Sequence, residues 1–333
     1  MAITLEEAKV GMADKVDQKV VDEFRRDSFL LDKLVFDDAV SPGTGGSTMT
    51  YGYTQLKTPS TAARRDINAE YENNEAKREK KTADLDIFGG SFKIDRVIQA
   101  TSGSVDEIDF QMKQKIKAAS NLFHHLVING SVKKETGFTQ CKFDGIRKLL
   151  TGTSTEKSAG GINLTDATNI DKYMYSFSLM INKWLQNMAE TPDMLLMNGD
   201  MQAVMQYIAQ KMGYFSREKN DFGHEVVSYR GIPMINAGKY YDGTKEVDCV
   251  DTTESNGHSS IIGLKIGLDA FHGICPAKVS AFIKSYLPDL NAPGAVKTGE
   301  AELVAGVVLK NTKMAGMLKD IQILPASSGG GTP

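Results

Sequence analysis

The side chains best suited to metal binding or nucleophilic catalysis are five histidines and three cysteines, and their spacing supports neither chemistry. These residues are His124, His125, His224, His258, His272, Cys141, Cys249 and Cys275. No histidine pair has the helical His-Glu-x-x-His spacing of a zinc site, and no second pair completes a tetrahedral set with His272 and Cys275. We therefore expect no catalytic residue, no metal and no cofactor, and we expect His124 and His125 to face water or a neighbouring chain.

A segment at residues 43–48 is as rich in glycine as a phosphate-binding loop, but it lacks the other features of that motif. Its sequence, Gly-Thr-Gly-Gly-Ser-Thr, lacks the lysine of that motif and does not join a hydrophobic strand to a helix. The chain also lacks the Gly-x-Ser-x-Gly turn that exposes a serine nucleophile. We interpret the segment as a hinge that follows an N-terminal arm.

Composition and charge exclude several classes of protein. The 333 residues are 41% hydrophobic and 24% charged, which allows a sizeable core in one large or two ordinary domains. A formal net charge of -3 excludes a global basic field that would coat nucleic acid. No apolar run approaches the roughly 20 residues that span a bilayer, and the first residues lack a secretory signal. We therefore expect the chain to stay in the cytoplasm of its host, with its cysteines reduced.

Residues 48–100 predict a long two-stranded excursion. Residues 48–53 alternate and are rich in threonine and tyrosine, residues 83–94 form a second strand-like run, and the residues between them are highly polar. Such a ribbon is marginal in isolation and exposes strand edges unless a partner covers them. The arm before it, with apolar positions from Val16 to Leu34, cannot bury its apolar face alone either. We expect both segments to pack on a neighbouring subunit.

The clearest helix is predicted from about residue 105 to residue 128. Ser104 and Glu107 form a capping-box pair, apolar residues repeat at steps of three and four, and Asn129-Gly130 is a good C-terminal signal. A helix of this length would be roughly 35 Å long, which is a long strut for one domain.

The rest of the chain predicts a compact α+β domain followed by closing strands. Two further amphipathic helices are expected near residues 170–188 and 200–211. The expected strands are residues 193–198, 225–228, 232–235, 260–269, 278–287, 302–309 and 317–324. If the last three strands return to pair near the long helix, the two lobes are interleaved in the sequence.

This order of parts resembles the Hong Kong-type capsid fold, which the major capsid proteins of tailed bacteriophages share. Three local runs are similar to segments of that family: Met194–Asp200, Tyr229–Ile235 and Glu302–Leu309. The resemblance spans nearly the whole chain and implies an α+β fold. It divides the chain into an N-terminal arm (1–47), an extended loop (48–100), a peripheral domain with a spine helix (101–149 and 276–325), an axial domain (150–275) and a flexible tail (326–333).

The resemblance implies a structural protein and not an enzyme. Copies of the chain would assemble as hexamers and pentamers into an icosahedral shell around the double-stranded DNA of a phage, in the cytoplasm of a host bacterium. Expected partners are further copies, a separate scaffolding protein, a portal, decoration proteins and DNA bound without sequence specificity, with no membrane. The residues expected to contact neighbouring subunits are Phe24, Arg64, Arg65, Glu70, Glu75, Lys77, Arg78 and Lys80.

Some capsid proteins of this kind also join subunits by a lysine–asparagine isopeptide bond. Candidate residues are Lys57, Lys77, Lys80, Lys81, Asn291 and Asn311, but their spacing identifies no reactive pair. Two other functions stay open at this point. The first is a cellular encapsulin-like compartment of the same fold with a protein cargo. The second is an α+β enzyme, which would need a pocket with convergent polar groups and has little use for a long polar ribbon.

Overall fold

The computed structural model describes residues 30, 33–40, 49–101, 106–213, 216–219, 225–251, 257–276 and 283–325. Its helices are α3 (Arg96–Thr101), α4 (Glu107–Asn129), α5 (Ile146–Leu150), α6 (Ala167–Gln186), α7 (Gly199–Lys211) and the short 3-10 turn η1 (Thr312–Met314). Its strands are β1 (Phe36–Val40), β2 (Thr50–Thr58), β3 (Lys77–Asp84), β4 (Asp86–Asp95), β5 (Gly130–Ser131), β6 (Thr139–Gln140), β7 (Glu156–Asn163), β8 (Met194–Met197), β9 (Ser216–Lys219), β10 (Glu225–Tyr229), β11 (Ile232–Asn236), β12 (Lys239–Tyr241), β13 (Glu246–Asp248), β14 (His258–Leu264), β15 (Phe271–Pro276), β16 (Ile283–Tyr286), β17 (Val296–Leu309) and β18 (Ala315–Gln322). None of these helices is long and apolar enough to cross a membrane.

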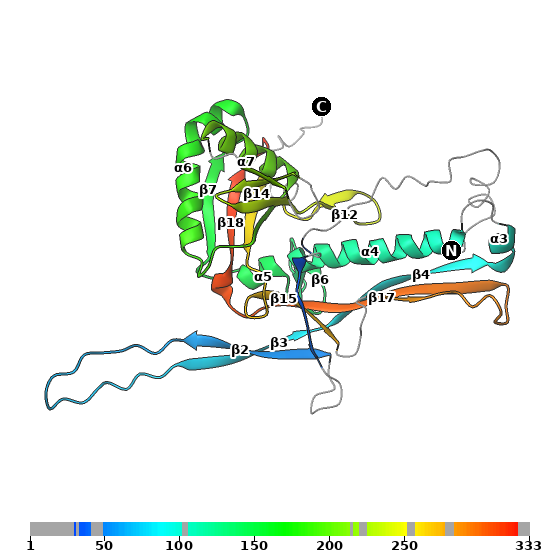
Figure 1. The fold of residues 1–333 in the computed structure, drawn as a ribbon, viewed down its shortest axis with the longest axis horizontal. Coiled ribbons are helices and arrows are strands. Elements are labelled where there is room, and N and C mark those ends of the chain that lie inside the picture. The colour runs from blue at the N-terminus through cyan, green and yellow to red at the C-terminus, as the bar shows by residue number, and fades with distance from the viewer. Residues whose placement is uncertain are drawn as a thin grey trace, which may run out of the picture.

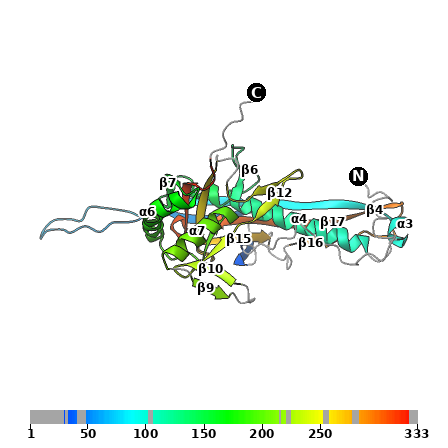
Figure 2. The same cartoon turned by 90° about the horizontal axis from the view of Figure 1, so that it is seen from above.

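The elements form an elongated molecule of three parts. Figure 1 shows a lobe that contains α6 and α7, a long limb built from α4, β4 and β17, and a thin ribbon, β2 and β3, that projects past the lobe. The view from above agrees, because the ribbon leaves the lobe on one side and the limb leaves it on the other (Figure 2).

The lobe is built on a seven-stranded sheet with the order β7-β18-β14-β8-β11-β10-β9. Successive residues of a strand point to opposite faces of a sheet, and β8 shows this clearly. Leu195 and Met197 pack with the buried residues of α6 and α7, whereas Met194 and Leu196 belong to the cluster at the end of α4. The central strand is buried on both faces, and its two apolar layers tie the lobe to the limb.

The limb is built on a second sheet, in which β17 pairs with β4, β15 and β16. The pairing of β4 with β17 runs from Asp95 opposite Val296 to Asp86 opposite Ala305. The helix α4 covers one face of this long ladder, and Met112 of the helix packs with Phe92 and Ile94 of β4. An amphipathic helix thereby covers a strand pair that would be marginal alone.

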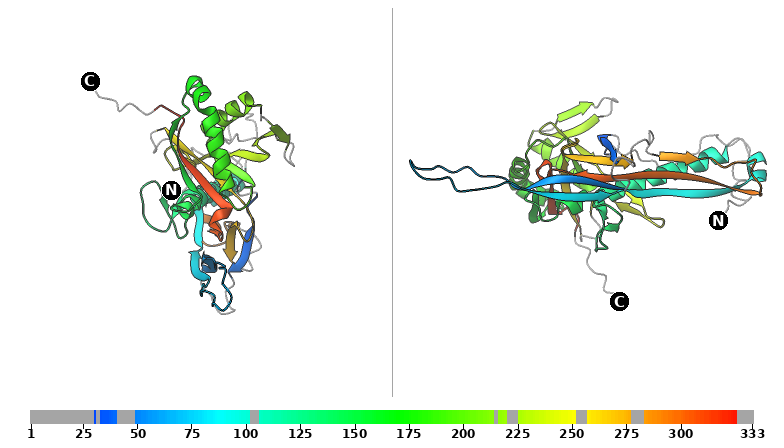
Figure 3. Two further views of the ribbon diagram at one scale, coloured as in Figure 1. Left: turned by 90° about the vertical axis from the view of Figure 1, so that its left-hand side faces the viewer. Right: turned by 90° about the horizontal axis from the view of Figure 1, so that it is seen from below.

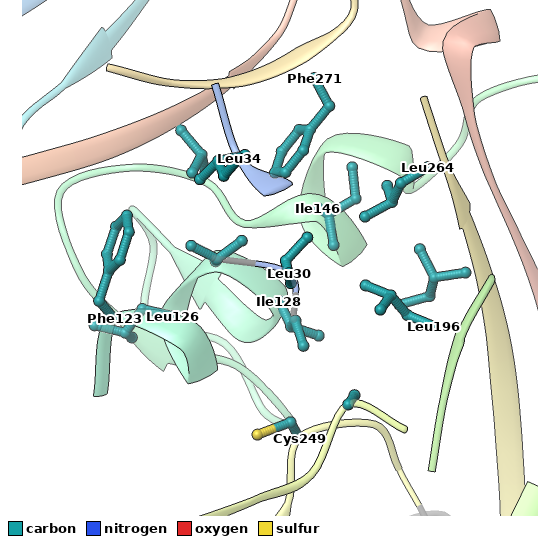
Figure 4. Close-up of a cluster of buried hydrophobic side chains, with 14 of the residues drawn as sticks. Leu30, Leu34, Phe123, Leu126, Ile128, Ile146, Leu196, Cys249, Leu264 and Phe271 are labelled. Carbon is teal, nitrogen blue, oxygen red and sulfur yellow. The ribbon is translucent and has the colours of Figure 1, made fainter. Parts of the chain in front are cut away.

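The lobe and the limb meet in one large buried cluster (Figure 4). It contains Phe123, Leu126 and Ile128 of α4, Ile146 of α5, Leu196 and Leu264 of the seven-stranded sheet, and Phe271 of the limb sheet, among others. Leu30 and Leu34, which precede β1, lie in the same cluster. The junction is a packed core, so the two parts do not behave as beads on a flexible linker.

The helix α4 begins with a different cap from the one predicted. The side chain of Asp106 accepts hydrogen bonds from the backbone N–H groups of Ile108 (3.0 Å) and Asp109 (3.2 Å). The predicted pair of Ser104 and Glu107 is therefore not the cap, and Ser104 lies outside the described residues. An aspartate accepts from the first free N–H groups as well as a serine does, so the chain offered two caps close together.

The other predicted helices and the hairpin between residues 225 and 235 are confirmed, with ends shifted by a few residues. The turn of that hairpin is Arg230-Gly231, and both residues have positive φ angles, 54° and 79°. Three strands lie in sheets other than those expected. β4, expected as the second strand of the ribbon, pairs with β17 in the limb sheet. β18 belongs to the seven-stranded sheet and pairs with β14 and β7, while β15, expected within the axial domain, pairs with β1 and β17. The bounds of the domains themselves stay a prediction.

Candidate assembly surface

The root of the ribbon is anchored on its own chain. Tyr51 and Tyr53 of β2 are buried with Leu85, Ile274 of β15 and Val308 of β17. Polar contacts reinforce this packing. The Tyr51 hydroxyl donates to the Asp37 carboxylate at 3.0 Å, and the Gln55 amide donates to the backbone carbonyls of Leu309 (2.9 Å) and Lys310 (2.8 Å). The start of the ribbon therefore leaves the limb sheet in a fixed direction.

A fully buried histidine lies beneath this root. His272 of β15 packs edge-on against Tyr51, with their ring centroids 6.1 Å apart. Neither ring nitrogen makes a well-formed hydrogen bond among the described residues, although the nearby backbone of Ala270 acts to raise the pKa of the ring. Burial lowers the pKa of His272, and the positive charge of Lys310 lowers it further. Burial also raises the pKa of Tyr51 and of Tyr53, so the neutral forms of all three rings are favoured at the root.

Beyond its root the ribbon is exposed. Every residue from 56 to 82 is exposed, and the apolar side chains are no exception: Leu56 is 62% exposed, Tyr71 61% and Ile67 92%. Soluble proteins do expose single apolar residues. A thin ribbon that carries three of them far from the lobe is, however, a surface suited to a partner.

The structure places seven of the predicted contact residues on this exposed ribbon. They are Arg64, Arg65, Glu70, Glu75, Lys77, Arg78 and Lys80. The tip brings Arg65 over the ring of Tyr71, 5.3 Å from its centroid, and Lys57 of β2 faces Glu79 of β3 at 3.7 Å. Phe24, the eighth, lies outside the described residues. The contacts of all eight with other subunits stay a prediction.

The ribbon is electrically polarised along its length. The stem, β2 with β3, carries five basic residues against two acidic residues: Lys57, Lys77, Arg78, Lys80 and Lys81 with Glu79 and Asp84. The tip carries Asp66, Glu70, Glu72 and Glu75 with Arg64 and Arg65. A partner surface that accepts this ribbon therefore has to match two different charges.

The two adjacent histidines of α4 contradict the expectation that they face water or a neighbour. Both are buried, with 8% of each side chain exposed. Nε2 of His124 donates to the carbonyl of Ala237 at 2.7 Å, and Nε2 of His125 is hydrogen-bonded to the Thr139 hydroxyl at 3.0 Å. Burial lowers the pKa of His124 and lowers that of His125 to about 4. They are structural groups that join the long helix to the lobe, because α4 ends inside the junction and does not run past it.

A polar network continues from these histidines into α5. The Asn129 side chain donates to the carbonyl of Cys249 (2.7 Å) and accepts from Arg147 (2.6 Å). Arg147 also pairs with Asp251 at 2.5 Å, and its guanidinium lies over the ring of Phe138. Charge-assisted bonds of this kind fix geometry well when they are shielded from water.

A cleft opens beside this network, between the end of α4 and the hairpin of β12 and β13. It encloses about 230 Å³. Its lining includes the stacked rings of His125 and Tyr240, whose centroids are 4.7 Å apart, the ring of Phe138, and three aspartates. The aspartates are Asp242, Asp248 and Asp251. No group of three or more metal-binding side chains in the described residues is arranged to hold an ion.

Sequence reasoning predicted a two-stranded ribbon, but with the wrong second strand: β2 pairs with β3, whereas β4, which makes up most of the expected run at residues 83–94, pairs with β17 in the limb. It also missed what anchors the root of the ribbon. Tyr51, Tyr53, Gln55 and His272 hold its root, and only the alternation of residues 48–53 hinted at an inward face. The cleft was also missed. Its residues come from three separate segments, near residues 125, 138 and 245, and no local pattern connects them.

Comparison with solved structures places this fold among viral and cellular shells. The chain is similar to the encapsulin of the holo-SrpI complex from Synechococcus elongatus PCC 7942, with 14% identity, a TM-score of 0.64, and coverage of 98% of this chain and 99% of that one. It is also similar to the capsid of Myoviridae phage XM1, with 12% identity, a TM-score of 0.56, and coverage of 92% and 96%. The capsid of a native GTA particle gives 10% identity, a TM-score of 0.57, and coverage of 97% and 98%. At these identities the likeness shows the α+β capsid fold alone.

A comparison with curated proteins found no significant relative. The sequence itself matches the profile of the SU10 major capsid protein over residues 27–232, which is more than half of the chain. That span includes the ribbon, the long helix α4 and much of the seven-stranded sheet. The chain belongs to the SU10 major capsid protein family and is therefore a structural subunit of a capsid.

Proposed function

We propose that copies of this chain close an icosahedral shell of hexamers and pentamers around double-stranded phage DNA, and that each ribbon completes its fold on a neighbouring copy. The observation that carries the proposal is the ribbon itself. Its residues 56–82 are all exposed, and Figure 3 shows it projecting well past the lobe. A two-stranded ribbon has too little core to be stable alone, and a second copy is the partner that a homo-oligomeric shell supplies.

The physical gain comes from many modest contacts. Once one contact between two copies has formed, the next is made at a high effective concentration, so weak interfaces add to a stable shell. Rings of five or six copies use heterologous contacts, in which two different sides of the chain meet. The ribbon and the opposite side of the lobe supply two such sides.

The proposal extends to other partners by their chemistry. A chain with a net charge of -3 does not bind packaged DNA tightly, so we propose that DNA fills the shell without sequence-specific contact. We also propose that a scaffolding protein, a portal and decoration proteins are partners of the shell. Assembly takes place in the cytoplasm of the host bacterium. The isopeptide link is testable directly, because cross-linked subunits of mature particles do not run as monomers in a denaturing gel.

The encapsulin of Synechococcus elongatus has the same fold as this chain, and a cellular compartment is therefore the second candidate. The contents of purified particles distinguish the two, since a phage shell protects DNA and a compartment carries a protein cargo. A gene neighbourhood with portal and protease genes supports the phage capsid.

Shortening the ribbon tests the role that we assign to it. Thr58 and Lys77 are paired across the two strands, so an Asn-Gly turn can replace residues 59–76 and close the ribbon as a two-residue hairpin. We expect the shortened chain to keep the melting temperature of the parent, because the removed residues are exposed. We expect it to lose closed shells in negative-stain electron microscopy and in sedimentation.

The control keeps the length of the ribbon and replaces only Thr61, a tip residue, by serine. That variant should assemble as the parent does. If the shortened chain closes shells as efficiently as the parent, the ribbon has no role in assembly and the proposal is wrong.

A further inference from the structure

The stem of the ribbon has two faces of different character. Directly opposed residues of an antiparallel pair share a face, so Tyr51, Tyr53 and Gln55 lie on the face that packs against the limb sheet. The other face presents Leu56 opposite Arg78 and Thr54 opposite Lys80. The Lys80 side chain lies over Gly52, where an added Cβ would meet Lys80 Cε at 3.3 Å.

This outward face combines one apolar side chain with two basic side chains. Leu56 is 62% exposed, and Arg78 and Lys80 are exposed beside it. An arginine next to an exposed leucine fits a partner site that offers both a ring and a carboxylate. A guanidinium stacks on aromatic faces and binds carboxylates through a planar fork.

The cleft beside α4 offers that combination. Its cavity of about 230 Å³ is lined by the rings of Phe138, His125 and Tyr240 and by three aspartates. Basic residues of the same chain lie nearby, since Asp251 pairs with Arg147 and Asp248 lies opposite Lys239 on the hairpin. The pKa of Asp242 is lowered to about 2 because its carboxylate accepts hydrogen bonds from the Thr244 hydroxyl and from the backbone N–H groups of Lys245 and Thr244. The mouth of the cleft therefore holds a fixed negative charge at neutral pH.

The two surfaces lie on opposite sides of the lobe. Figure 1 shows the ribbon leaving the lobe on the side of α6, whereas the β12 hairpin lies on the other side, above α4. A ring of copies related by rotation brings one side of each lobe toward the other side of the next. The basic stem of one copy and the acidic, aromatic cleft of the next are a complementary pair of this kind.

We propose that the cleft between α4 and the β12–β13 hairpin receives the ribbon stem of a second copy, with Arg78 as the inserted side chain and Leu56 packed at the rim. This inference rests on the proposed function, because it names the surface that the ribbon contacts. Arg78 stacks on the rings of the cleft and pairs with Asp248, which lies on β13. Asp251 is left to Arg147, its partner within the same chain.

A charge exchange tests the pairing. Arg78→Glu and Asp248→Arg should each raise the concentration needed for shell assembly by about tenfold or more, measured by sedimentation velocity and electron microscopy. The double variant should recover most of that loss, since the pair is restored with reversed charges. Lys93→Glu is the matched control, because it makes a comparable change of charge at an exposed residue of β4 in the limb, outside the ribbon and the cleft, and should leave assembly within about twofold of the parent.

Asp248→Asn removes the charge with little change in shape, so it is less disruptive to the hairpin, in which Asp248 lies opposite Lys239. Thermal denaturation of each variant shows whether it folds. The proposal is overturned if both Asp248 variants fold and assemble normally while Arg78→Glu does not, because the stem then binds another surface. It is equally overturned if the Asp248 variants fail and Arg78→Glu assembles, because a different segment then occupies the cleft. Normal assembly of the shortened ribbon chain, by contrast, refutes the proposed function itself.

Discussion

The buried histidine at the root of the ribbon makes the root sensitive to acid. His272 is fully buried against Tyr51, and burial lowers its pKa below the ordinary 6.5. The charged groups that face it are Asp37 of β1, Lys310 after β17 and Asp269 before β15. A group with a lowered folded-state pKa contributes stability above its unfolded pKa, and that stability is lost as the pH falls below about 6.5.

We therefore expect His272→Phe to flatten the loss of stability in acid. Phenylalanine keeps a ring against Tyr51, and it removes two buried nitrogens that make no well-formed hydrogen bond among the described residues. The melting temperature of the unassembled chain should be similar for parent and variant at pH 7.5, and the variant should melt higher at pH 5.5. The contribution of one proton is at most about 1.4 kcal/mol per pH unit.

His124 and His125 titrate in parent and variant alike, so their effect cancels in this comparison. Parallel losses in the two proteins between pH 7.5 and pH 5.5 would show that His272 does not govern the acid response.

At the scale of residues, exposure along the ribbon was predictable and burial elsewhere was not. Residues 60–82 are so polar that no core could include them, and the structure exposes every one. His124 and His125 were expected to face water or a neighbouring chain because they lie late in the long helix. Their burial depends on Ala237 and Thr139, which are distant in the sequence or separated by a turn, and no local pattern reports such partners.

Among the elements, the long ladder of β4 and β17 tolerates a side chain at one glycine and not at its neighbour. An added Cβ at Gly89 would lie 2.1 Å from the carbonyl oxygen of Ala301, whereas at Gly90 it would lie 3.2 Å from Lys115 Cδ. The first neighbour is backbone and cannot move without breaking the ladder. The second is part of a flexible side chain.

We expect Gly89→Ala to destabilise the chain by about 1–3 kcal/mol or more and Gly90→Ala to change its stability by less than about 0.5 kcal/mol. Urea denaturation of the two unassembled variants measures the difference. Equal stabilities would mean that the close approach of β4 to β17 is not as the structure has it.

The elements were predictable where a pattern is local, and their partners were not. The helix α4 was predicted from about residue 105 to residue 128 and runs over Glu107–Asn129, since its apolar positions repeat along the segment. The run at residues 317–324 was correctly expected to be a strand. Its alternation could not show that β18 pairs with β14 and β7, because pairing is decided by residues far away in the chain.

At the scale of the whole molecule, the limb and the ribbon extend from the lobe in different directions (Figure 1). The limb is a covered structure, because α4 lies along β4 and β17 and buries their apolar face. The ribbon has no such cover beyond its root, and its exposed apolar residues lie at 56, 67 and 71. We propose that neighbouring copies cover these exposed residues in the assembled shell.

The order of parts and the family could be predicted from the sequence because each part has its own pattern of polar and apolar residues. The polar ribbon, the periodic helix and the closing strands follow one another in the order of the capsid fold. The contact that we propose between copies could not be predicted from the sequence, because it combines a face of the ribbon with a cleft made from three segments.

The path of the ribbon in an assembled particle tests this account most directly. A cryo-electron microscopy map of shells formed by the full chain should show residues 56–82 crossing onto an adjacent copy, with Arg78 at the cleft beside α4. A map in which the same residues fold back onto their own lobe, with no contact to any neighbour, would contradict it.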